Sequence, residues 1–193
     1  MRTSEFSIRH DPVSIPDARR AFREAPLATL VATGFGVGLS PVAPGTAGSV
    51  LGLLFAWSIA RGISSGLGPS LTAGVGLLMS GLAVGLAGVA ASTRACRALG
   101  AKDPGCVVID EIAGQLLASA PVPLFAFASP LGAWAAWLLS LTAFRLFDIW
   151  KPGPVGSLQD LPGGWGVVAD DVAAGLLAAG TTAAACLAGL ARL

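Results

Sequence analysis

The sequence predicts an all-α, polytopic integral membrane protein with about five transmembrane helices. Of its 193 residues, 54% are hydrophobic and only 12% are charged. A soluble domain carries about 25% charged residues, so a surface facing water would be badly under-charged. Four stretches of the chain carry no charged side chain, and each is long enough to cross a bilayer core, which takes about 20 residues. These stretches, which lack Asp, Glu, Lys and Arg, are residues 25–60, 62–93, 112–144 and 172–191.

Five apolar segments are the expected spans, and a broken segment precedes them. Glycines and prolines interrupt residues 27–43, and irregular backbone at membrane depth is tolerated only where protein or a watery cavity covers it. We therefore expect a re-entrant or interfacial element there. The second span has a small-residue face suited to close helix packing, formed by Gly74, Gly81, Gly85 and Gly88. The spans are residues 48–63, 68–92, 111–128, 131–149 and 171–191.

The chain divides into two predicted parts. Residues 1–24 are polar, with five arginines and four acids, and are expected to form a cytoplasmic tail that ends in a short surface helix at 16–24. Residues 25–193 form a single membrane-embedded domain. The lone histidine, His10, is expected to be a solvated tail residue. The sequence has no early apolar run, so we expect no cleavable signal peptide.

The distribution of basic residues predicts the orientation in the membrane. With the N-terminus inside, ten Lys and Arg residues lie on the cytoplasmic side and only Arg61 and Arg192 lie outside. Basic residues favour cytoplasmic loops. The same topology places all seven acids beyond residue 24 on the cytoplasmic side.

Three acidic clusters at the helix ends predict a metal site. Asp110 and Glu111 open the third span, Asp148 ends the fourth, and Asp170 and Asp171 open the fifth. Acids at a helix N-terminus can be simple caps that favour the helix dipole, but this alternative does not explain Asp148. Because several carboxylates converge with few basic partners, we expect all five to be catalytic and metal-ligating. Mg²⁺ prefers such oxygen ligands.

Residues near these carboxylates predict phosphate binding. A planar Arg fork matches phosphate oxygens, which favours Arg145, with Lys151 as a second cation. Thr46 and Ser49 begin the first span, where backbone N–H groups can cradle an anion. The alternatives are a snorkelling Arg145 or its salt bridge to Asp148, and simple capping by Thr46 and Ser49.

Several classes of function lose support. The net charge of +1 favours no nucleic-acid partner. Cys96, Cys106 and Cys186 have no metal-ligand spacing and are expected to be small apolar packing residues. One tail histidine makes phosphohistidine chemistry implausible, and cysteine-phosphatase and aspartyl-phosphate motifs are absent. Metal-activated water remains as the mechanism, with an Asp nucleophile left open.

At these residues the chain resembles the phosphatidylglycerophosphatase A family. The resemblance extends over residues 34–175. It rests on three blocks in order: residues 34–49 (GFGVGLSPVAPGTAGS), residues 103–114 (DPGCVVIDEIAG), and residues 144–152 (FRLFDIWKP) continuing to 163–175 (GGWGVVADDVAAG).

The resemblance implies a Mg²⁺-dependent phosphatase of the bacterial inner membrane. Such an enzyme removes the terminal phosphate of the lipid phosphatidylglycerophosphate to give phosphatidylglycerol, and its site would face the cytoplasm. The implied site residues are the three acidic clusters together with Arg145, Lys151, Thr46 and Ser49. Oligomeric state is not predicted.

An ion-coupled transporter and a lipid-head-group transferase are the alternative functions. An ion-coupled transporter also places carboxylates beside broken elements, but its charges lie near the midplane and its sequence shows internal repeats, neither of which is found here. A lipid-head-group transferase is disfavoured because its Asp-Gly-x-x-Ala-Arg signature is absent.

Overall fold

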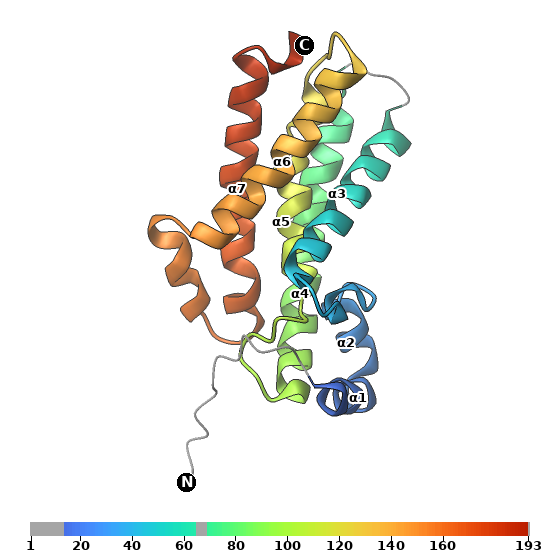
Figure 1. Ribbon diagram of the computed structural model, residues 1–193, viewed down its shortest axis with the longest axis vertical. Coiled ribbons are helices and arrows are strands. Elements are labelled where there is room, and N and C mark those ends of the chain that lie inside the picture. Colours follow the sequence, from blue (N-terminus) through green and yellow to red (C-terminus); the bar gives the residue numbers. More distant parts are fainter. Residues whose placement is uncertain (1–13, 65–68, 193) are drawn as a thin grey trace.

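The computed structural model describes residues 14–64 and 69–192, in which the only regular secondary structure is helical, without strands (Figure 1). Three 3₁₀ segments lie between helices, η1 (Val37–Leu39), η2 (Val122–Leu124) and η3 (Gly153–Asp160), and a fourth, η4 (Leu190–Arg192), follows the last helix. The α-helices are α1 (Ile15–Glu24), α2 (Pro26–Ala32), α3 (Pro44–Ile63), α4 (Leu71–Leu99), α5 (Ile109–Ser119), α6 (Pro130–Trp150) and α7 (Gly164–Leu187).

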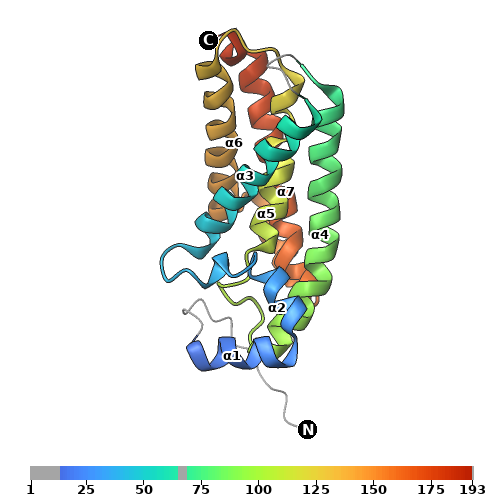
Figure 2. The same cartoon turned by 90° about the vertical axis from the view of Figure 1, so that its right-hand side faces the viewer.

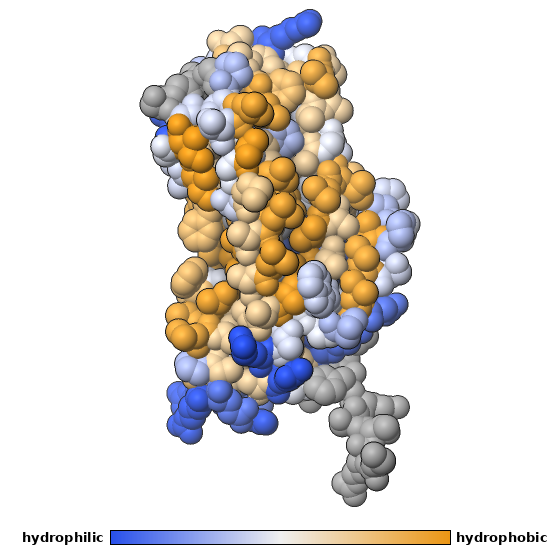
Figure 3. Space-filling model, turned by 180° about the vertical axis from the view of Figure 1, so that it is seen from behind, coloured by the Kyte–Doolittle hydropathy of each residue, from blue (hydrophilic) through white to orange (hydrophobic). Residues whose placement is uncertain are grey.

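Four of these helices, α3, α4, α6 and α7, are long and apolar enough to cross a membrane. They run along the long axis of the molecule (Figures 1 and 2). Large apolar side chains cover the middle of the surface seen in Figure 3, and hydrophilic residues gather toward its ends. An exposed apolar surface of this extent is what lipid-facing helices present. Leucines midway along each helix are more than half exposed: Leu54, Leu86, Leu138 and Leu176.

The third expected span is a short central helix followed by irregular chain. Helix α5 has 11 residues, of which ten are buried, and at 1.5 Å per residue it is only about 16 Å long. It packs against α3, α4, α6 and α7. Pro121 and Pro123 follow it, and proline cannot continue a helix because it lacks the N–H donor. Helices α4, α6 and α7 pack against η2 and Val122 is buried there, whereas Leu124, Ala126 and Ala128 are exposed.

The glycine face expected on the second span is buried in α4. A Cβ at Gly81 would lie 2.8 Å from the Leu117 side chain, and one at Gly88 would lie 3.3 Å from Ile109. Both neighbours belong to α5. The small residues therefore let α4 approach the central helix closely, as predicted.

The segment before α3 is broken, as its glycines and prolines predict. Helix α2 ends at Ala32, whose carbonyl accepts a 2.8 Å hydrogen bond from the Val108 N–H at the start of α5. Phe35 and Ala43 have positive φ angles, 58° and 45°. This irregular backbone carries the chain around the start of α5 and into α3.

The polar N-terminal part contains α1, which forms where a surface helix is expected. Its N-cap Ser14 accepts from the Asp17 N–H, and its residues pack against α2 and α4. In Figure 2 the helix lies across one end of the bundle. His10 lies outside the described residues, and the division of the chain at residue 24 stays a prediction.

Helices α5 and α7 touch through a pair of glycines. A Cβ at Gly175 would overlap the Gly114 carbonyl oxygen, and a Cβ at Gly114 would lie 2.7 Å from the Asp171 carbonyl oxygen. Each glycine follows an acid of the expected site by four residues, one helical turn: Asp110 on α5 and Asp171 on α7. The contact between these two backbones therefore also sets the distance between the two carboxylates.

This contact predicts opposite effects for two glycine substitutions in α7. Gly175→Ala is expected to destabilise the protein by about 1–3 kcal/mol, the usual cost of overpacking, and to push α5 and α7 apart. Gly180→Ala is the matched control, because a Cβ there meets nothing within 4 Å. It is expected to be neutral or to stabilise by roughly 0.5–1 kcal/mol. Equal unfolding free energies for the two variants in detergent micelles would contradict the packing argument.

Candidate metal and phosphate site

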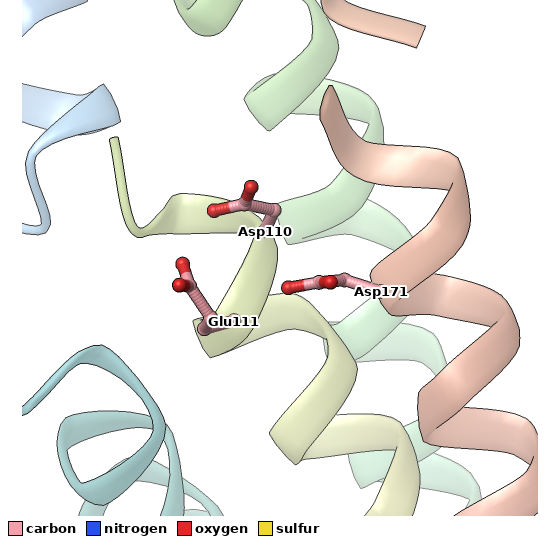
Figure 4. Close-up of side chains that lie close together, drawn as sticks. All are labelled: Asp110, Glu111 and Asp171. Carbon is pink, nitrogen blue, oxygen red and sulfur yellow. The ribbon is translucent and has the colours of Figure 1, made fainter. Parts of the chain in front are cut away.

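Three carboxylates from two helices meet at one end of the bundle. Asp110 and Glu111 lie in the first turn of α5, and Asp171 lies in the second turn of α7. One oxygen of each carboxylate lies within 4.8 Å of the other two. Figure 4 shows the Asp171 side chain extending from α7 toward Asp110 and Glu111 at the start of α5. We name these three residues the carboxylate cluster.

The carboxylate cluster lacks the partners that buried acids need. Asp110 is 7% exposed and Asp171 is 4% exposed. Asp110 Oδ1 and Glu111 Oε2 are buried, with no hydrogen-bond partner in the described part of the chain. Buried charges are normally paired or coordinate a metal. The donor set is all oxygen, which fits Mg²⁺, so the residues present suit the cation that the sequence predicts.

Helix α6 brings an arginine and a fourth carboxylate to the cluster. Arg145 Nη1 donates to Asp148 Oδ2 at 2.5 Å and to Ser49 Oγ at 3.4 Å. The Asp148 side chain lies close to those of Glu111 and Asp171. The Arg145–Asp148 salt bridge explains how an acid is tolerated at a helix C-terminus. The arginine retains a buried Nε without a partner among the described residues.

The N-terminus of α3 closes the site. A Cβ at Gly45 would overlap Glu111 Oε1 and would lie 3.4 Å from Arg145 Nη1, so only glycine fits there without displacement. No side chain caps α3. Within residues 14–64 and 69–192, the backbone N–H groups of Gly45 and Thr46 have no acceptor. Two free donors therefore point out of a helix N-terminus beside an arginine, which is the arrangement that binds anions.

The two hydroxyl groups predicted near the phosphate differ in their surroundings. Thr46 is exposed in the first turn of α3. Ser49 is fully buried, and its hydroxyl donates to the Gly45 carbonyl at 2.9 Å and accepts from Arg145. Neither side chain caps the helix, so the capping alternative does not hold. Ser49 fixes the position of Arg145 relative to α3.

Asp170 lies next to Asp171 but forms a separate ion pair. Its Oδ2 accepts from Lys151 Nζ at 2.5 Å and from Gln159 Nε2 at 3.0 Å. Lys151 ends α6 in a left-handed conformation, φ 47°. The pair therefore joins the end of α6, the η3 turn and the start of α7. Gln159 was not predicted, because nothing in its sequence context marks it.

The pKa of Lys151 is raised above its usual value. Burial of the ammonium acts to lower it, but the hydrogen bond to Asp170 and the charges of Asp170, Asp171 and Asp148 outweigh this. Lys151 therefore stays protonated at neutral pH. It is a fixed positive charge on the Asp170 side of the site.

The three cysteines are all buried. In the loop before α5, burial raises the pKa of Cys106 to about 11, with a smaller contribution from Asp103. A thiol with such a pKa is neutral and unreactive at physiological pH. The packing role predicted for the cysteines fits this environment.

The chain is similar in sequence to proteins that are named as lipid phosphatases. The family described as Phosphatidylglycerophosphatase A matches residues 30–186. The Escherichia coli protein "Phosphatidylglycerophosphatase A" is 32% identical over 152 residues, which cover 78% of each chain. The Haemophilus influenzae protein of the same name is 32% identical over 155 residues, covering 77% of this chain and 82% of the relative.

A third relative has a different name. The Bacteroides thetaiotaomicron protein "Putative phosphatidylinositol-3-phosphatase" is 34% identical over 151 residues, covering 78% of this chain and 87% of its own. No solved structure matches. The family match spans most of the chain and contains every residue of the carboxylate cluster. The protein is therefore a phosphatase that belongs to the phosphatidylglycerophosphatase A family.

Proposed function

We propose that the protein hydrolyses the terminal phosphomonoester of phosphatidylglycerophosphate, yielding phosphatidylglycerol and inorganic phosphate. One observation carries the proposal: the carboxylate cluster lies directly beside Arg145 and the free N–H groups at the start of α3. A cation site and an anion site that share a border suit a metal-dependent phosphatase. The names of the Escherichia coli and Haemophilus influenzae relatives supply the substrate.

Asp110, Glu111 and Asp171 would hold the metal, which we propose to be Mg²⁺. When bound, the cation neutralises charge on the phosphoryl group and lowers the pKa of a water molecule. Arg145 binds the phosphate through its guanidinium fork, and the N–H groups of Gly45 and Thr46 donate to its oxygens. Asp148 is placed to accept a proton, because it adjoins the cluster without belonging to it.

The last turn of α6 offers a path for the lipid chains. Leu146, Ile149 and Trp150 are 57%, 74% and 68% exposed, although Arg145 and Asp148 on the same turn face the site. In our proposal the acyl chains stay in the bilayer against these apolar side chains while the head group reaches the carboxylates. The excess of Lys and Arg at this end supports a cytoplasmic site in a bacterial inner membrane.

Metal removal tests the cluster directly. Chelation is expected to abolish phosphate release by the purified protein, and Mg²⁺ is expected to raise its Tm because a ligand that binds only the folded state stabilises it. Asp171→Asn should remove the Tm shift and lower kcat by at least about 100-fold, the upper range seen for second-shell partners. Asp160→Asn is the control, because Asp160 is an exposed acid on the same side. A full Mg²⁺-dependent Tm shift in Asp171→Asn would exclude the metal assignment.

The role of Asp148 can be separated from that of the ligands. We expect Asp148→Asn to lose most phosphate release, by about 10²–10⁴-fold as for a general base, and to retain the Mg²⁺-dependent Tm shift of the wild type. Loss of the shift would instead make Asp148 a ligand.

Asp170→Asn, which breaks the pair with Lys151, is expected to lower phosphate release as well. Full activity in this variant would remove Asp170 from the site.

Arg145→Lys tests phosphate binding. The substitution keeps the charge but loses the planar fork, so we expect KM to rise roughly ten- to hundredfold, equivalent to about 1.5–3 kcal/mol for a charge-assisted hydrogen bond. Arg94→Lys, on α4 and outside the site, should leave KM unchanged. Kinetics on both phosphatidylglycerophosphate and phosphatidylinositol 3-phosphate would also define the substrate. An unchanged KM in Arg145→Lys would contradict the assigned role.

A further inference from the structure

An aromatic cavity lies at the end of the bundle opposite the carboxylate cluster. It has a volume of about 230 Å³ and is enclosed by the end of α3, the chain around η2 and the start of α6. Its main lining residues are Trp57, Arg61, Phe125, Phe127, Trp134 and Trp137. Trp57 and Trp134 stack with their ring centroids 6.1 Å apart and their planes at 20°. Nothing in the proposed phosphatase mechanism uses this cavity.

The cavity has no acidic side chain: its polar groups are the indole N–H groups of Trp57, Trp134 and Trp137, the Arg61 guanidinium and the Ser64 hydroxyl. In the described residues, the indole N–H groups of Trp57, Trp134 and Trp137 make no hydrogen bond, and Arg61 has no ion pair. The described residues at this end, 55–64, 69–75, 118–137 and 185–192, include no Asp or Glu. Arg61 lies in the last turn of α3, where the helix dipole favours a cation but does not provide a full negative charge to pair with it. Charge complementarity therefore requires an anionic ligand with acceptor oxygens.

The size and position of the cavity indicate a lipid. Pockets that enclose a whole ligand usually measure about 300–1,000 Å³, so this cavity takes only part of a larger molecule. Trp57 and Trp134 are 38% and 52% exposed on membrane-spanning helices, and tryptophan is typical of the membrane interface. A molecule that leaves one part in the bilayer and places another beside Arg61 is a phospholipid.

We propose that this cavity binds an anionic glycerophospholipid of the leaflet opposite the carboxylate cluster. A segment of one acyl chain occupies the aromatic slot, and the phosphate contacts the Arg61 guanidinium. The indole N–H groups donate to ester and phosphate oxygens. Because α3 has 20 residues and rises about 1.5 Å per residue, the bound lipid lies roughly 25–30 Å from the phosphatase site and is distinct from its substrate.

The tryptophans provide a direct test. The chain has five, and replacing Trp150 and Trp165 by Phe leaves three, all of which line the cavity. This variant is reconstituted in phosphatidylcholine vesicles that contain a small, increasing fraction of lipid with brominated acyl chains. Brominated phosphatidylglycerol is expected to reach half-maximal quenching at about fivefold lower mole fraction than brominated phosphatidylcholine, the preference that one basic residue confers. Equal mole fractions would overturn the proposal.

Four further variants in the same background locate the effect. Arg61→Gln should abolish the preference and Arg61→Lys should keep it, whereas Arg192→Gln, the other cation at this end, should leave it unchanged. Ala133→Leu fills the cavity without changing charge, so it should weaken quenching at low mole fractions. A preference that survives Arg61→Gln, or quenching unaffected by Ala133→Leu, would exclude the cavity as the site. Phosphate release by Arg61→Gln in the native chain should equal that of the wild type, which separates this test from the proposed function.

Discussion

The backbone contact between α5 and α7 is the constraint on which the carboxylate cluster depends. Gly114 and Gly175 let the two helices touch one turn beyond Asp110 and Asp171. Acids brought together in a buried place repel each other, and desolvation opposes their ionisation. Helix packing offsets this cost, because apolar and small residues hold α5 among four neighbours. The site is therefore formed by packing rather than by the attraction of its own charges.

The same packing explains the central position of α5. A helix of 11 residues cannot cross a bilayer alone, but four longer helices surround it, and three of them also pack against η2 in the irregular chain that follows. The short helix has its N-terminus at the site, where Asp110 and Glu111 also benefit from the helix dipole. The irregular chain after it forms one wall of the aromatic cavity. One element thus contributes to both ends of the molecule.

Much of the architecture could be predicted from hydropathy and charge. The all-helical class and the clustering of acids at one end follow from charge-free stretches bounded by polar residues. The early end of α5 was not predicted, because residues 112–128 carry no charge and Pro121 and Pro123 alone do not fix where the helix ends. The metal assignment of Asp148 and Asp170 stays a prediction. The structure places Asp148 with Arg145 and Asp170 with Lys151, outside the three-carboxylate group.

The sequence by itself determined that this is a membrane protein with an acidic, phosphate-directed site, since composition and the order of polar motifs are one-dimensional properties. Only the tertiary structure decided which carboxylates share a space. Asp170 and Asp171 are neighbours in the chain, yet successive residues of a helix point about 100° apart, so one joins Lys151 and the other joins α5. Tertiary packing likewise assembled the aromatic cavity, whose residues come from two separate stretches of the chain, 57–64 and 122–137.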